Sequence, residues 1–171
     1  MSDGRNLRCW SALMFYKMWQ IFPRSKELAY NRAIHNDLLN LLKDPDPEVR
    51  AASVYSLGQL ARTKLLLKNA DFFFLDFSLC HKIALCSKDG SPLVRFLVLV
   101  ALFRFVCRNK EHFVSESAPV FPNKNSAKFA RAQRKELKLI LETIDRMKRD
   151  PFGRISSCAE SFCAHLNLTS F

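Results

Sequence analysis

The chain has 171 residues, of which 49% are hydrophobic and only 4 are glycine, and its formal net charge is +11. This size fits one folded domain or about four layers of a helical repeat. The 7 prolines at segment boundaries and the scarcity of alternating apolar and polar residues predict an all-α chain rather than a β-rich one. The positive charge suggests an acidic partner or non-specific affinity for polyanions, and does not by itself indicate nucleic-acid binding.

Cysteine usage and hydropathy bear on the compartment. The first residues lack the apolar stretch of a signal peptide. We therefore expect free thiols in a reducing compartment, where cysteine behaves as a small buried hydrophobe. The longest apolar run, 96–103, has eight residues, whereas a membrane span needs about 20, so no transmembrane segment is expected. The six cysteines are Cys9, Cys80, Cys86, Cys107, Cys158 and Cys163.

The predicted elements, in chain order, are helices that pair. Residues 1–8 are expected to be a frayed start, and the aromatic helix 10–22 the second helix of a layer whose first helix is missing. Helix 25–42 and helix 47–61 form the next pair, followed by a connection over 62–70. The core side of helix 25–42 is expected to carry Leu28, Ile34, Leu38, Leu39, Leu41 and Leu42.

The rest of the chain continues the pattern. Helices 72–87 and 92–107 form a third layer, the loop 109–126 is expected to be a mobile insertion, and helix 127–149 is followed by a last amphipathic helix. We expect a single HEAT/armadillo-like repeat domain over 1–171, an α-solenoid with layers at about 9–22, 25–61, 72–107 and 127–166.

One turn motif recurs and carries the repeat prediction. The stretches 44–50 (DPDPEVR) and 89–95 (DGSPLVR) share an Asp, a Pro three residues later, and an Arg at the end. Pro47 and Pro92 lie 45 residues apart, within the 40–47-residue period of HEAT and armadillo repeats. A degenerate copy follows at 150–156 (DPFGRIS). The motif residues are Asp44, Pro47, Val49, Arg50, Asp89, Pro92, Val94, Arg95, Asp150 and Pro151.

Each motif residue has a local role. Asp46 and Ser91 are predicted to cap a helix, and proline suits the first helical position. Val49, Ala52, Leu57 and Leu60 are predicted to form a buried face. The Asp–Arg pairs could hold stacked layers in register or line a binding edge, and their recurrence favours the first. In the third copy Ser156 replaces the arginine, so an Asp–Arg pairing is expected to be lost there.

The sequence lacks the motifs that are typical of enzymes and of metal sites. Residues Cys80, His81 and Cys86, and residues Cys158, Cys163 and His165, lack the paired short spacing of zinc ligands. The sequence contains no Gly-rich phosphate loop, no G-x-S-x-G and no H-E-x-x-H. We therefore expect no enzyme activity, no catalytic, cofactor-binding or metal-binding residues, no cofactor, and no small-molecule substrate.

The long helix 127–149 begins with a basic stretch. It could contact an acidic protein surface, phosphates or anionic lipid. A solvated helix face is the favoured interpretation, because charge runs usually lie on such faces. The residues of this candidate contact surface are Lys128, Arg131, Arg134, Lys135 and Lys138.

These residues, in this order, resemble the central helical-repeat region of the raptor family, the scaffold subunits of TOR complex 1. The similarity extends over an aromatic helix with Trp (9–22), the DPDPEVRAA repeat, the DGSPLVR repeat and a DPF-type repeat. The family's caspase-like region and WD40 propeller are not found in this sequence, so we expect a fragment, a split gene product or a reduced homologue.

The resemblance implies a non-catalytic scaffold or adaptor that binds the TOR kinase, supports nutrient-responsive TOR signalling, and offers a surface to Rag-type GTPases. It also implies a cytoplasmic location, with recruitment to the lysosomal or vacuolar surface by partners. The alternative, from charge alone, is a basic helical-repeat module that binds nucleic acid or another polyanion.

Overall fold

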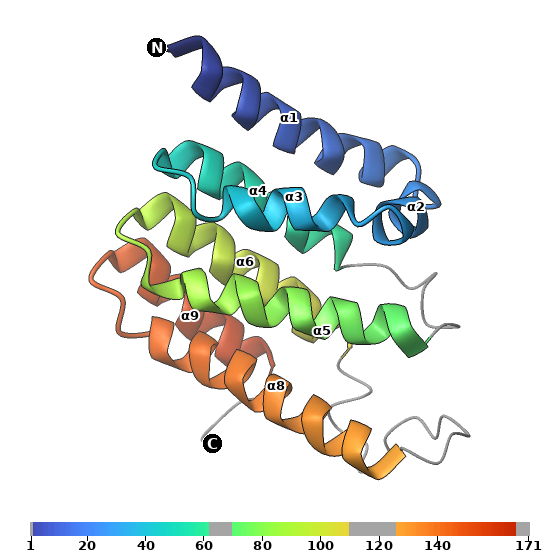
Figure 1. Ribbon diagram of the computed structural model, residues 1–171. Coiled ribbons are helices and arrows are strands. Elements are labelled where there is room, and N and C mark those ends of the chain that lie inside the picture. Colours follow the sequence, from blue (N-terminus) through green and yellow to red (C-terminus); the bar gives the residue numbers. More distant parts are fainter. Residues whose placement is uncertain (1, 62–69, 110–125, 167–171) are drawn as a thin grey trace.

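The computed structural model describes residues 2–61, 70–109 and 126–166, with side chains described for 4–61, 75–109 and 135–166. The elements in these ranges are helices joined by short turns, which confirms the all-α prediction (Figure 1). They are α1 (Ser2–Ile21), α2 (Ser25–Asn31), α3 (Ile34–Leu41), α4 (Pro47–Leu60), α5 (Ala70–Leu85), the 3₁₀ turn η2 (Cys86–Lys88), α6 (Pro92–Arg108), α8 (Ser126–Met147) and α9 (Gly153–His165).

The helices stack in two rows, as in a solenoid of helix pairs. Helices α1, α4, α6 and α9 follow one another in one row, with α1 packed on α4, α4 on α6, and α6 on α9 (Figure 1). Helices α3, α5 and α8 lie along the other side, each packed on the helix of the first row that follows it in the chain. We call the first set the B row and the second the A row.

The core runs between the two rows. Val49, Leu57 and Leu60 of α4 are fully buried and Ala52 is 5% exposed, which confirms the buried face predicted for this helix. Leu102 of α6 is equally buried, as are Ile140 and Ile144 of α8 and Ile155 of α9. Burial of apolar area is the dominant favourable term in folding, so these contacts between layers provide most of the cohesion.

The prediction of one helix over 25–42 is wrong. The chain breaks at Ala33, whose φ of 55° places it in the left-handed region, a conformation that costs an L-residue about 1–2 kcal/mol. No glycine or proline marks this point in the sequence, so contacts distant in the chain offset the strain. Tyr30, just before the break, is 5% exposed and donates a hydrogen bond to Asp76 of α5.

Two further expectations fail near the start of the chain. Residues 1–8 were expected to fray, but α1 begins at Ser2. Its first turns are held by Arg8, which pairs with Asp44, and by Arg5, which lies 3.7 Å from Asp46. Leu28, assigned to the core side of the predicted helix, is 53% exposed, because the break at Ala33 sets the direction of α2 independently of α3.

A glycine in α4 sets how closely the B-row helices approach. A Cβ placed on Gly58 would lie 2.8 Å from the Cβ of Ala101 in α6. Alanine has no flexible end that could move aside, so any larger residue at position 58 must push the two helices apart.

We predict that Gly58→Ala lowers the free energy of unfolding by about 1–3 kcal/mol, the usual cost of overpacking, despite the higher helix propensity of alanine. Gly153→Ala is the matched control, because a Cβ there would meet nothing within 4 Å. Urea unfolding followed by circular dichroism measures both. Equal stability of the two variants would show that the close approach of α4 and α6 is not required.

Candidate functional site: an arginine–aspartate ladder

The repeated turn is built by hydrogen bonds within each motif. Asp44, Asp89 and Asp150 each accept a hydrogen bond from the backbone N–H two residues later, at 2.9, 2.8 and 2.9 Å respectively. These bonds fix the aspartate side chain at the start of a B-row helix.

Helix capping differs between the two full motifs. Asp46 caps α4 by accepting from the N–H of Glu48 at 2.9 Å, as predicted. The predicted cap by Ser91 is wrong, since its side chain makes no capping bond to α6. The backbone N–H of Ser91 instead donates to Asp89, which fixes the turn by way of the aspartate.

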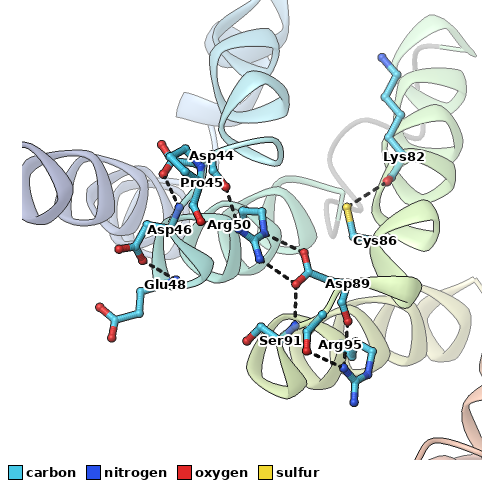
Figure 2. A network of polar contacts seen from close by, with 11 residues as sticks. Asp44, Pro45, Asp46, Glu48, Arg50, Lys82, Cys86, Asp89, Ser91 and Arg95 are labelled. Atoms are coloured by element: carbon cyan, nitrogen blue, oxygen red, sulfur yellow. Dashed lines mark hydrogen bonds and ion pairs between the residues drawn. The ribbon is translucent and has the colours of Figure 1, made fainter.

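Each arginine of the motif reaches the aspartate of the next layer. Arg50 donates from Nε and Nη2 to the two carboxylate oxygens of Asp89, at 2.7 and 2.9 Å (Figure 2). Arg95 makes the same two-pronged contact with Asp150, at 2.7 and 3.0 Å. Such paired bonds between guanidinium and carboxylate are the geometrically specific kind. We call this series of contacts the ladder.

The same arginines also bind their own turn. The Nη1 of Arg50 donates to the carbonyl oxygens of Asp44 and Pro45, at 2.7 and 3.0 Å (Figure 2). The Nη1 of Arg95 likewise donates to the carbonyls of Asp89 and Gly90, at 2.9 and 3.2 Å. One guanidinium thus connects the backbone of its own layer to the carboxylate of the following layer.

This offset corrects the expectation that the third motif lacks an ion pair. Asp150 is paired, because its partner is Arg95 in the preceding layer. Ser156 stands in the arginine position of the third motif. By the same offset, an arginine at this position would pair with an aspartate of a following layer and not with Asp150.

A first rung at Arg8 was not found from the sequence. Arg8 in α1 donates to Asp44 at 2.7 and 3.1 Å, with the geometry of the other two rungs. The signal was weak but present, since Leu7-Arg8 resembles Val49-Arg50 and Val94-Arg95. The position six residues before Arg8 is Ser2 rather than Asp.

The arginines of the ladder are more deeply buried along the chain. Their side-chain exposure falls from 41% for Arg8 to 18% for Arg50 and 11% for Arg95, whereas the paired aspartates are all 12% exposed or less. The hydrogen bonds from Arg95 hold the pKa of Asp150 below its usual range, and those from Arg8 do the same for Asp44. Burial raises the pKa of Asp89, but the hydrogen bonds from Arg50 and Ser91 outweigh it, so this pKa is also lowered.

Helix α5 makes two polar contacts with other helices outside the ladder, which the sequence did not reveal. His81 of α5 contacts Glu136 of α8. Asp76 of α5 accepts from Tyr30 of α2 and is 6% exposed, and its burial raises the pKa of this carboxyl to about 7. These contacts join residues 46 and 55 positions apart, and no local pattern marks them.

The basic stretch is placed only in part. Lys128, Arg131 and Arg134 lie in the first half of α8, where side chains fall outside the described residues. Lys135 is exposed, and Lys138, 78% exposed, lies 3.8 Å from Glu142 one turn along the same helix. The loop expected over 109–126 lies, apart from its two end residues, outside the described residues.

Among the described residues, no three His, Cys, Asp or Glu side chains come together as a metal site would require. None of the helices in the described part of the chain is both long and apolar enough to cross a membrane. The six cysteines carry free thiols, and Cys80 and Cys163 are buried.

The ladder gives a direct prediction for Arg95→Lys. A lysine cannot make the two-pronged contact with Asp150 while also reaching the turn carbonyls, so we expect the free energy of unfolding to fall by about 1–3 kcal/mol. Arg104→Lys on the exposed side of the same helix should change it by less than about 0.5 kcal/mol. Chemical denaturation measures both, and an equal effect of the two substitutions would contradict a structural role for the rung.

Acid should weaken the ladder. Because the pKa of Asp44, Asp89 and Asp150 is lower in the folded than in the unfolded chain, their stabilisation is present above the unfolded value of about 3.9 and is lost as the pH falls through the folded values. We predict that the free energy of unfolding falls less for Asp150→Asn than for the wild type when the pH is lowered from about 5 to about 3. Denaturant titrations across this range measure the difference, and parallel curves would contradict the prediction.

Comparison with known proteins agrees with the architecture. The HEAT-repeat family model matches residues 36–63, which span most of α3, the first turn motif and α4. "Regulatory-associated protein of TOR 2" of Oryza sativa subsp. japonica is 34% identical over 126 residues, 68% of this chain and 9% of that protein. "Regulatory-associated protein of TOR 1" of Arabidopsis thaliana is 32% identical over 129 residues, 69% of this chain and 9% of that protein.

A third relative matches a shorter part. "Protein raptor homolog" of Dictyostelium discoideum is 43% identical over 54 residues, 32% of this chain and 4% of that protein. The chain thus spans less than a tenth of the length of the relatives it matches. The resemblance inferred from the sequence is confirmed, and the chain is a HEAT-repeat helical solenoid related to a part of raptor, the regulatory-associated protein of TOR.

Proposed function

We propose that the chain is a non-catalytic scaffold module that binds the TOR kinase and takes part in TOR signalling and growth control. The observation that carries the proposal is the combined relation to raptor-type proteins and the layered helix pairs, which build a continuous ridged surface. The names of these relatives associate them with TOR, and we extend that association to this chain.

The ladder supports a scaffold role in a physical way. Three rungs hold successive layers together near the N-terminal ends of the B-row helices, and the contact of Tyr30 with Asp76 joins α2 to α5. A surface whose layers are held in register changes little on binding, and pre-organisation lowers the entropic cost of association.

Partners and location beyond the kinase remain predictions. Binding of Rag-type GTPases and recruitment from the cytoplasm to a lysosomal or vacuolar surface derive from the family resemblance. The polyanion alternative depends on the basic residues of α8, of which Lys135 and Lys138 are exposed. No contact of the described residues favours it over a solvated helix face.

Co-purification tests the kinase proposal. The tagged full chain, shown to be folded by circular dichroism, should retain TOR kinase from an extract of its own organism after nuclease treatment and a high-salt wash. An excess of untagged chain should displace the kinase, whereas nucleic acid should not. Absence of the kinase with folded protein, or loss of all binding in moderate salt as counterion release predicts for a polyanion site, would contradict the proposal.

A further inference from the structure

A group of polar side chains is buried where α2 meets α4 and α5. Asp76 of α5 is 6% exposed and accepts a hydrogen bond from the hydroxyl of Tyr30 in α2, which is 5% exposed. Lys26, one turn before Tyr30, is 4% exposed and donates to the carbonyl of Gln59 in the last turn of α4, at 2.7 Å. We call Lys26, Tyr30 and Asp76 the α2 cluster. A buried carboxylate is costly, so the protonation state of Asp76 affects how firmly α2 is held.

The groups that face Asp76 come from three helices. Burial raises the pKa of this carboxyl to about 7, because it outweighs the hydrogen bond from Tyr30 and the positive charges of Lys26 and Arg108 of α6, which lower it. Burial also raises the pKa of Tyr30 and of the Cys80 thiol on α5, so both stay protonated at neutral pH. Side chains in the first half of α8, which also packs on α5, lie outside the described residues. Within the α2 cluster, Asp76 is therefore the group that titrates near neutral pH.

One more titratable side chain lies beside the α2 cluster. The ring of His35 in α3 is tilted against that of Tyr30, with the ring centroids 5.5 Å apart. Burial lowers the pKa of His35, so the stability that its neutral ring provides is present above the unfolded value of about 6.5 and is lost as the pH falls. This dependence has the opposite sign to that of Asp76, and a test must separate the two.

Helix α2 depends on the α2 cluster because it is weak by itself. It has seven residues, and no side chain caps its first turn. Helices shorter than about 12 residues are marginal without tertiary contacts. Figure 1 shows α2 at the corner between α1 and α3, outside both rows, and the left-handed Ala33 follows it. Strained backbone of this kind is found at hinges and switch regions, and release of α2 would relieve it.

We propose that α2 is a pH-sensitive latch, which stays docked while the Asp76 carboxyl is protonated and moves away, turning about Ala33, when that carboxyl ionises. The proton passes to water, and the released form lets water solvate the carboxylate. Release also breaks the contact of Lys26 with the end of α4. This inference goes beyond the proposed function and does not depend on it, because it concerns a response of the fold itself.

The pH window follows from the two forms of the latch. The carboxyl of Asp76 has a pKa of about 7 when α2 is docked, and about 3.9 when it is solvated. The stabilisation of the docked form by the bound proton is complete below about pH 3.9 and is lost as the pH rises through about 7. The effect of Asp76 on the released population is therefore a rise of about tenfold per pH unit between these values, with a plateau above them.

Hydrogen exchange of the full chain tests the latch, measured by mass spectrometry on peptides from α2 and α4. Exchange rates are divided by the intrinsic rate at each pH, so that the protection factor reports opening alone. Between about pH 5.5 and about pH 8, protection of α2 should fall at least about tenfold more in the wild type than in Asp76→Asn. The comparison cancels the contribution of His35, which both proteins retain. Asp37→Asn, at an exposed position of α3, is the matched control and should keep the wild-type response.

A second measurement observes the carboxyl directly. Carbon-13 NMR of aspartate carboxyls should show one group that titrates near neutral pH in the wild type and is missing in Asp76→Asn. The hydrogen bond from Tyr30 lowers the pKa of Asp76, so Tyr30→Phe should move this titration to higher pH. If Asp76→Asn does not fold, the wild type and Tyr30→Phe still decide. An aspartate set that titrates entirely below about pH 5, equal pH responses of the wild type and Asp76→Asn, or loss of protection in α4 together with α2 would overturn the inference.

Discussion

The two-pronged hydrogen bond from an arginine of one layer to the aspartate of the next is the constraint on which the stack depends. The guanidinium is planar and rigid, and Arg50 and Arg95 also bind carbonyls of their own turn. The distance and orientation between adjacent layers are therefore fixed at their N-terminal edge. Further along the helices, the contact of Gly58 with Ala101 fixes the spacing again. Two points of close approach between α4 and α6 determine how these helices cross, and the packed core fills the remainder.

The ladder also bears on which surfaces are left for a partner. The carboxylate of Asp89 accepts from Arg50 and from the N–H of Ser91, and that of Asp150 accepts from Arg95 and from the N–H of Phe152. Groups engaged in this way have little capacity for an external ligand. The ladder is therefore suited to holding layers together, and we expect any partner to bind outside it.

The helices that are marked by local sequence features could be predicted from the sequence. Proline at the first helical position and an apolar face of period 3.6 located α4 and α6, including the burial of Val49 and Leu57. Features that depend on contacts between residues far apart in the chain could not be predicted from the sequence. The left-handed Ala33 has no glycine or proline to mark it, and its strain is offset by packing that brings Tyr30 to Asp76.

The ladder lies between these cases. Its residues were identified from the repeat, but a sequence cannot say whether Arg50 pairs with Asp44 of its own motif or with Asp89, 39 residues away. A double-mutant cycle answers this most directly, with Arg50→Gln combined either with Asp89→Asn or with Asp44→Asn and stability measured by denaturant unfolding. The interlayer ladder predicts a coupling energy of about 1 kcal/mol or more for Arg50 with Asp89, and a smaller one for Arg50 with Asp44. A larger coupling with Asp44, or none with Asp89, would contradict it.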